Sequence, residues 1–263
     1  MKLKMKLMAA AVAMAAASGA NAAIDNGATG NGELFFNIWD ANGSYTRDLN
    51  ISFSSFESTV AGAGAIHLQY SADSLLTQFF AGTSAAGART GAYKFNLVAN
   101  DNSGSGVGSR GMLLTYTEPA PASPILASTA RSAETAMLNF ATAVNTPLGA
   151  NQSVAVNSAS TAFAGKAGFK DTVGGLMNFS NAGGVANNSY ASGLSFMNLR
   201  NDALGSAPSA YNQLFDGGEV HVYLDANQTL HIQAVPEPET YALMLAGLGM
   251  LGLMARRRLN NRA

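Results

Sequence analysis

Cysteine is absent from this sequence. Disulfide bonds, thiol nucleophiles and zinc sites built on cysteine are therefore excluded. Charged residues make up only 12% of the 263 residues, so few ion pairs are available to hold a fold together. A chain of this length can bury enough apolar surface to fold without covalent bridges. The sequence therefore predicts a body stabilised mainly by burial.

Basic residues are scarce in the middle of the chain. The whole sequence has 15 basic and 16 acidic residues, but seven of the basic ones lie outside 23–240 and none of the acidic ones do. The stretch 23–240 thus holds 15 − 7 = 8 basic and 16 acidic residues, a net charge of 8 − 16 = −8. Nucleic acid binding needs a basic surface, so this function class is excluded.

Long apolar runs are also missing. Tyr241 to Ala255 is free of charge, but fifteen helical residues span only about 22 Å of the ~30 Å hydrocarbon core. Arg256, Arg257 and Arg258 follow directly, and a positive flank stays on the cytoplasmic side. We expect a short transmembrane helix over 241–255 that is recognised and then removed. The alternative is an ordinary single-pass anchor preceded by a proline linker.

The other end has the layout of a secretory signal peptide. Lys2, Lys4 and Lys6 precede an apolar stretch over 7–17, and the small residues Ala20 and Ala22 form a cleavage box. A buried N-terminal helix is the alternative, but it would leave the three lysines without partners in a core. The pattern predicts a signal peptide over 1–22 with cleavage after Ala22, and export of the rest.

Two prolines stand just before the apolar tail. In Val235-Pro236-Glu237-Pro238 the prolines hold the backbone extended and remove hydrogen-bond donors, so the segment stays accessible. A Pro-Glu-Pro motif, an apolar helix and an arginine cluster, in this order, resemble the PEP-CTERM sorting signal of Gram-negative bacteria. The resemblance covers about 25 residues and defines a sorting segment over 235–263.

The resemblance carries expectations about destination and partners. It implies recognition and processing by an exosortase, a membrane-embedded protease that acts transiently on such tails. The precursor would be anchored in the inner membrane and the product would reach the cell surface or the medium. Proteins of this kind commonly accompany exopolysaccharide and the biofilm matrix, which makes an extracellular polysaccharide a possible partner.

For the body, residues 23–234, the sequence predicts an all-β fold. It is rich in Gly, Ala, Ser, Asn and Thr, which favours strands and polar loops. GELFFNIWDANGSYTRDLNISF predicts a hairpin whose type I′ turn is Asn42-Gly43. That turn sets the expected pairs Ala41–Ser44, Ile38–Arg47, Phe36–Leu49 and Leu34–Ile51.

A second hairpin is expected in GEVHVYLDANQTLHIQAV. A loop over 226–228 pairs Leu224 with Leu230 and Val222 with Ile232. Further strands are predicted over 65–70, 92–99, 111–117 and 193–200, and 164–193 is expected to be a long loop or irregular edge.

One helix interrupts the strands, near 124–144. Ser123 and Pro124 suit its start, and apolar residues recur at intervals of three and four: Leu126, Ala130, Ala133, Met137, Phe140 and Val144. The expected architecture is a β-sandwich or jelly-roll with this one amphipathic helix inserted.

Candidates for chemistry are few. His221 and His231 are expected on the outer face of the last hairpin, and His67 is the remaining histidine. No carboxylate cluster is identifiable beside them, so no metal site is predicted. Asp40-Ala41-Asn42 and Asp225-Ala226-Asn227 are explained by turn formation without calcium. The glycines of 100–111 lack the lysine and helix of a phosphate-binding loop.

Catalytic signatures are not found either. No Gly-x-Ser-x-Gly elbow occurs, and no cofactor is expected. Four aromatic residues are candidates for stacking on sugar rings: Trp39, Tyr45, Tyr70 and Tyr223. Trp39, flanked by phenylalanines, is expected in the core instead. The sequence favours a non-enzymatic structural or adhesive surface protein. The alternative is a secreted polysaccharide-binding module or glycan-active hydrolase with the same sorting tail.

Overall fold

The fold was determined as a computed structural model. It describes the following residues: 23–63, 67–91, 93–116, 127–166, 193–201, 210–212, 214–215, 218–235, 247–248 and 250.

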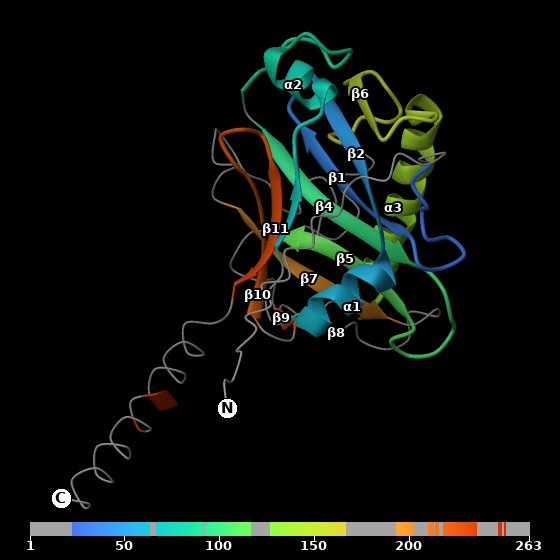
Figure 1. The fold of residues 1–263 in the computed structure, drawn as a ribbon. Coiled ribbons are helices and arrows are strands. Elements are labelled where there is room, and N and C mark those ends of the chain that lie inside the picture. Colours follow the sequence, from blue (N-terminus) through green and yellow to red (C-terminus); the bar gives the residue numbers. More distant parts are fainter. Residues whose placement is uncertain are drawn as a thin grey trace, which may run out of the picture.

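A single antiparallel sheet of 11 strands forms the frame of the body (Figure 1). Nine strands follow one path in the order β3-β11-β10-β7-β5-β4-β1-β2-β6, while β8 pairs with β7 and β9 with β10. The strands are β1 (Glu33–Trp39), β2 (Gly43–Ser52), β3 (His67–Tyr70), β4 (Lys94–Asp101), β5 (Arg110–Tyr116), β6 (Ser153–Asn157), β7 (Leu194–Asn201), β8 (Ala210–Asn212), β9 (Leu214–Phe215), β10 (Gly218–Leu224) and β11 (Leu230–Val235).

This sheet is open but strongly curled. Its edge strand β3 and the loop after it reach across to β2, near the opposite edge, through side chains alone. The Tyr45 hydroxyl donates to Asp73 at 2.8 Å, and Arg47 donates to the carbonyl of Ser71 at 2.7 Å. The Arg47 guanidinium also lies 5.6 Å from the centre of the Tyr70 ring. The curl therefore encloses a concave face between the two ends of one sheet.

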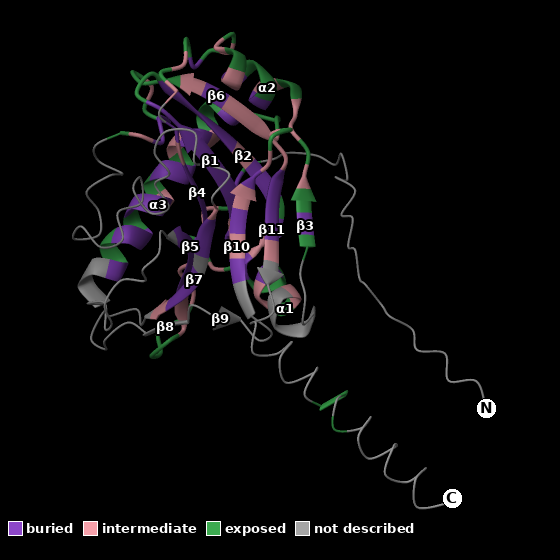
Figure 2. Ribbon diagram, turned by 90° about the vertical axis from the view of Figure 1, so that its left-hand side faces the viewer, coloured by how far each residue is buried: buried purple, intermediate pink, exposed green. Residues whose placement is uncertain are grey.

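The concave face holds the larger core. Strands from both ends of the sheet contribute buried residues to it, β1, β2 and β4 from one side and β3, β10 and β11 from the other (Figure 2). Its aromatic members include Phe36, Tyr45, Phe79 and Phe95, whose ring centres lie 6.2 to 6.4 Å apart in successive pairs. Aromatic pairs at such distances stabilise a core beyond the area they bury.

Two short helices close the ends of the concave core. The helix α1 (Phe53–Ala63) contributes Phe53 and Phe56 at one end, and α2 (Ser74–Ala81) contributes Leu76 and Phe79 at the other. In α2 the Asp73 side chain accepts the backbone N–H of Leu76, which caps the helix start. Gly82 ends the helix with a φ of 70°, a conformation that favours glycine.

The third helix, α3 (Ala127–Leu148), covers the convex face. Ala130, Ala133, Met137, Phe140 and Val144 are all buried against that face, as their spacing predicts. Phe140 stacks on Phe35 of β1, with the ring centres 5.9 Å apart. The start expected at 123–126 lies outside the described residues, so only the body of the helix and its apolar face are confirmed.

Polar side chains also lie beneath this convex layer. The Thr46 hydroxyl donates to Asn37 at 2.7 Å, and the Asn37 amide donates to Asn96 at 2.8 Å. All three side chains are buried and come from the neighbouring strands β2, β1 and β4. Because each bond satisfies groups that would be costly to bury alone, this ladder fixes the register of three central strands.

The first predicted hairpin exists, but its register next to the turn was wrong by two residues. Past an irregularity between Glu33 and Phe35, Glu33 pairs with Ser52, which is the predicted register. Trp39 pairs with Ser44 and Ile38 with Tyr45, so four residues, 40–43, form the turn. Neither Asn42 nor Gly43 has the positive φ of a type I′ turn. Asp40 sets the longer turn instead, because its side chain accepts the N–H groups of both residues. A shift of two keeps every side chain on its predicted face.

The second hairpin is confirmed in detail. Leu224 pairs with Leu230 and Val222 with Ile232, as predicted. The expected strands appear as β3, β4, β5 and β7 with ends moved by no more than two residues. Of the loop expected over 164–193, nearly all lies outside the described residues.

The predicted all-β class is confirmed only in part. The described strands form one curled sheet, so the two-sheet sandwich or jelly-roll is not confirmed. Three helices, not one, occur among the described residues. The helices α1 and α2 were missed because each is short, so the apolar residues that they bury cover too few turns to establish a helical period.

A buried carboxyl lies at a bulge in this sheet. Asp48 is 2% exposed, and one of its oxygens accepts the N–H of Asn50, whose φ is 53°, while the other has no partner. Burial raises the pKa of Asp48 to about 6; the Asn50 N–H opposes this shift and the charge of Glu33 adds to it. The folded protein therefore disfavours the charged form.

The variant Asp48→Asn tests this cost. Since the folded pKa lies above the unfolded value, the wild type loses stability as the pH rises from about 4 to about 6. A neutral Asn escapes that loss. We expect the free energy of unfolding of the variant, relative to wild type, to rise by up to about 3 kcal/mol between pH 4 and pH 7.5. Urea unfolding of both proteins at the two pH values measures it.

The variant Asp101→Asn is the control, because the pKa of Asp101 is shifted in the opposite direction to that of Asp48. Burial alone would raise the pKa of Asp101, but hydrogen bonds from the Ser103 hydroxyl and N–H lower it below its usual value. This variant should lose stability relative to wild type as the pH rises. If Asp48→Asn shows the same trend as Asp101→Asn, the charged form of Asp48 is not disfavoured.

Candidate functional site

Two Asp-Ala-Asn turns are the most elaborate polar features of the body. In each, one oxygen of the aspartate accepts the N–H of the asparagine two residues later: Asp40 from Asn42 at 2.9 Å, and Asp225 from Asn227 at 2.9 Å. These contacts are Asx turns, which need no ion. The predicted turn-forming role of both aspartates is confirmed. Each aspartate also binds a basic side chain: Asp40 binds Arg89, 49 residues away, and Asp225 binds His231, 6 residues away in the same hairpin.

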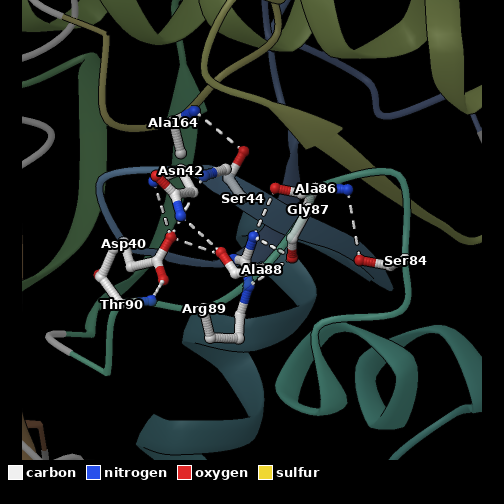
Figure 3. Close-up of polar contacts among 11 residues, drawn as sticks. Asp40, Asn42, Ser44, Ser84, Ala86, Gly87, Ala88, Arg89, Thr90 and Ala164 are labelled. Atoms are coloured by element: carbon white, nitrogen blue, oxygen red, sulfur yellow. Dashed lines mark hydrogen bonds and ion pairs between the residues drawn. The ribbon is translucent and has the colours of Figure 1, made fainter.

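Asp40 binds Arg89. The guanidinium donates to Asp40 Oδ1 at 3.1 Å, with the two side chains 6% and 0% exposed (Figure 3). The other oxygen, Oδ2, accepts the N–H of Thr90 at 2.6 Å. Three backbone N–H groups and one guanidinium thus surround a fully buried carboxylate, which compensates for its loss of water.

Arg89 is itself held on several sides. It donates to the carbonyls of Ala86 and Gly87, and its guanidinium lies 4.2 Å from the centre of the Phe79 ring (Figure 3). Asn42 adds a bond to the carbonyl of Ala88 at 2.6 Å. The pair therefore fastens the segment 82–91, which follows α2, onto the turn between β1 and β2. Every one of these bonds is internal, so the arrangement is a structural clamp.

Asp225 binds His231. Asp225 Oδ2 lies 3.0 Å from His231 Nε2, and Oδ1 also accepts the N–H of Thr229. The pKa of Asp225 lies below its usual value, chiefly because of the bond from His231, with further help from the N–H groups of Thr229 and Asn227 against a small opposing effect of burial. The second turn is thus tied to β11 by a carboxylate–imidazole pair.

His231 has aromatic neighbours on both sides. Tyr223, its partner across β10 and β11, stacks on it with ring centres 4.6 Å apart and planes 3° apart. On the other side, His67 Nε2 of β3 lies 3.4 Å from His231 Nδ1. Gln69 places its amide nitrogen 2.9 Å from His67 Nε2 and 3.3 Å from His231 Nδ1.

The histidine prediction was right about the face, and the structure adds a contact that the sequence did not suggest. His221 and His231 share the outer face of the hairpin, as expected, yet His231 contacts His67. The contact arises because β3 pairs with β11, which places Gln69 opposite His231 and His67 opposite Gln233. A pairing across 164 residues leaves no local signal in the sequence. In the part of the chain that the structure describes, no three His, Asp or Glu side chains gather to hold a metal.

The aromatic candidates for sugar stacking are engaged elsewhere. Trp39 is 4% exposed and lies in the convex-face core, so its assignment to the core is confirmed. Tyr45 is fully buried on the concave side. Tyr70 carries Arg47 over its ring, and Tyr223 stacks on His231. These contacts occupy ring faces that a sugar would need.

The glycine-rich segment after β4 connects two neighbouring strands. β4 and β5 pair directly on either side of it, and Gly104 and Gly108 have φ values of 81° and 73°. Val107 at its tip is 80% exposed. The segment is a hairpin loop, as predicted, and no helix N-terminus follows it.

The predicted sorting residues lie at the end of β11 and beyond. Val235 is the last residue of β11 and pairs with Glu219. Pro236, Glu237, Pro238 and the arginines 256–258 lie outside the described residues, as do Ala20 and Ala22 of the expected signal cleavage site. From the expected transmembrane helix, Gly247, Leu248 and Met250 are described and helical. Across the described ranges, no helix is both long and apolar enough to span a membrane.

Comparison with protein-family models identifies the tail. Residues 234–258 match the PEP-CTERM protein-sorting motif, which confirms the resemblance found in the sequence. The motif indicates an exported protein whose precursor passes through the membrane, is processed by an exosortase and reaches the cell surface or the medium. Searches of curated proteins and of solved structures found no significant match.

The Asp40–Arg89 clamp predicts the effect of removing its cation. In Arg89→Met, Asp40 keeps its backbone donors but becomes a buried carboxylate without a countercharge. We expect a loss of about 3 kcal/mol in the free energy of unfolding, measured by urea denaturation. The double variant Asp40→Asn/Arg89→Met, which buries no charge, should recover part of this loss. A single variant as stable as wild type would show that the clamp contributes nothing.

Proposed function

We propose that the body is a non-enzymatic structural or adhesive protein of the cell surface, released from a membrane-anchored precursor and associated with exopolysaccharide or the biofilm matrix. The observation that carries this proposal is the sorting motif over 234–258, which continues directly from the last strand of the fold. Processing by an exosortase is the step that such a tail serves.

The N-terminal boundary of the body suits removal of a signal peptide over 1–22. Ala23 is exposed, whereas Ile24 is buried. The Asn145 side chain of α3 accepts the Ile24 N–H at 2.8 Å and donates to the Ile24 carbonyl at 2.9 Å. Cleavage after Ala22 would therefore leave the first buried residue fastened to the fold.

The C-terminal boundary has a similar property. Ala234 and Val235 are matched by the sorting motif and are also paired with Val220 and Glu219 in the sheet. Cleavage anywhere beyond Val235 would keep β11 complete. Both boundaries thus allow processing of the ends without loss of any described strand.

The use of polar groups inside the body supports a structural role. Asp40, Arg89 and the ladder of Thr46, Asn37 and Asn96 make internal bonds that hold segments together. The ring faces of Trp39 and Tyr45 are buried. A released body with a net charge near −8 would be repelled by anionic lipid and could leave the membrane surface.

Localisation of two epitope tags tests the sorting step. One tag follows Ala263, and the other enters the exposed loop between Gly106 and Val107, where added atoms meet nothing within 4 Å of Gly106. In a host with an exosortase, we expect the loop tag at the surface or in the medium, separated from the terminal tag. In a host without one, both tags should stay together in the membrane fraction.

Variants of the tail test which of its parts direct processing. Replacing Arg256, Arg257 and Arg258 with Ser removes the charges that hold the tail at the inner leaflet. Replacing 236–238 with Ala removes the extended, accessible segment. We expect the processed form to fall below detection on immunoblots in both variants, while the body still folds. Control variants are Asn260→Ser/Asn261→Ser and Glu239→Ala; processing of the test variants to wild-type size would leave the tail as an anchor only.

The surface role needs its own test. The full chain, purified after export, is applied to a glycan array and to a panel of polysaccharide hydrolysis assays. We expect retention on neutral exopolysaccharide without turnover. Turnover of any polysaccharide would contradict the non-enzymatic role, and absence of all retention would contradict the association with the matrix.

A further inference from the structure

Three rings from three adjacent strands form a row on the convex side of the sheet: Tyr223 of β10, His231 of β11 and His67 of β3. The row ends at β3, which is an edge strand with only four residues and pairs only with β11 among the described strands. His231 is 8% exposed, whereas His67 is exposed to solvent.

The two imidazoles face each other nitrogen to nitrogen. Their ring centres are 5.7 Å apart and their nearest nitrogens are 3.4 Å apart, so the two distances differ by 5.7 − 3.4 = 2.3 Å. This difference equals the distance from ring centre to nitrogen added for the two rings. The two nitrogens therefore lie on the line that joins the ring centres. Lone pairs on these nitrogens would point at each other rather than converge on a third point. The geometry suits one shared proton and does not suit chelation of a metal.

Asp225 sets the proton positions in this pair. A carboxylate only accepts, so the 3.0 Å contact places a proton on His231 Nε2. In neutral His231, Nδ1 then carries a lone pair, which accepts from His67 Nε2–H or from the Gln69 amide. A first added proton makes His231 an imidazolium paired with Asp225. A second would place two positive rings head to head.

We propose that His67 and His231 form a pH-sensitive clasp that holds the edge strand β3 against β11 at neutral pH and releases it at mildly acidic pH. With both imidazoles protonated, the two N–H groups point at each other and the charges repel. Rotation of the Gln69 amide would supply one acceptor but leave both charges in place. His67 is the mobile partner because it lies at the exposed edge, while Asp225 and Tyr223 hold His231.

Few other described groups lie close enough to alter the protonation of His67 and His231. β10 and its turn present Asp225, Tyr223 and His221 on the same face, and β11 presents Gln233 opposite His67. β3 adds Gln69. Among the described residues, Asp225 is the carboxylate in contact with the pair, and it already binds His231, so the described part of the chain offers no comparable partner for a charge on His67. Histidine is the side chain that commonly serves as a switch in mildly acidic solution.

Release is expected to be local. Leu68 on the other face of β3 packs in the concave core, and Tyr70 donates weakly to the Leu49 carbonyl at 3.4 Å. Among the described residues, β3 pairs with β11 alone, through four residue pairs. Loss of these pairs would expose the edge of β11, the strand that leads into the sorting motif. An unpaired edge is a template for pairing with another strand.

Hydrogen exchange of the β3 amides tests the clasp. The full chain, purified after export, is compared at pH 7.5 and pH 5.0 after correction for intrinsic exchange rates. We expect protection of 67–70 to fall at least tenfold at pH 5.0, while β1 and β4 stay protected. A matching signature is a coupled two-step titration of His67 and His231 ring signals by NMR.

Two single variants separate the clasp from general acid effects. His67→Gln keeps a polar side chain at an exposed position but cannot gain charge, so β3 protection should no longer depend on pH. His221→Gln, on the same face but outside the pair, should behave as wild type. The proposal is overturned if wild-type β3 is equally protected at both pH values, or if His67→Gln loses protection at pH 5.0 as strongly as wild type.

Discussion

Burial of apolar side chains between the two ends of one curled sheet is the constraint on which this structure depends. Because the chain has no cysteine, no cross-link joins β3 to β2, yet both contribute to the concave core. The helices α1 and α2 close the ends of that core, and each depends on the curl for the surface it covers. A flatter sheet would expose Tyr45, Phe79 and Phe95 together, so the curl and the core stabilise each other.

Charged side chains in this fold mainly hold segments of the chain together. Asp40 and Asp225 show the same solution twice: the carboxylate forms its own turn and then binds a basic side chain, Arg89 from a distant segment in one case and His231 from the same hairpin in the other. The two pairs differ in what pH can do to them. Arg89 is charged at every relevant pH, so its clamp is permanent, whereas the bond to an imidazole changes with protonation.

Local patterns allowed much of the fold to be predicted from the sequence. The alternation of Val220, Val222 and Leu224, and the spacing of Ala133, Met137 and Phe140, identified β10 and α3 because those periods reflect a buried face. The capping pattern of α2, Asp73 with Gly82, was also present in the sequence and could have identified that helix. The register of the first hairpin was wrong because the Asp40 side chain competes with the backbone preference of Asn42-Gly43.

Long-range pairing explains what could not be predicted. The contact of His67 with His231 and that of Asp40 with Arg89 join segments whose sequences carry no sign of each other. The curl of a single sheet, rather than two sheets face to face, likewise depends on contacts such as Tyr45 with Asp73. The sorting tail was the exception among functional features, because its three parts are adjacent in the chain.

The place of β11 within the sheet has a consequence for the order of events during export. This strand is the last of the body to be synthesised, yet it lies between β10 and β3, whose residues precede it by up to 164 positions. The early strand β3 has no partner among the described strands until β11 arrives, and pairings over such separations form slowly. Because β11 leads directly into the sorting motif, cleavage of the tail before β11 has joined β10 and β3 would release a body whose last strand is still unpaired.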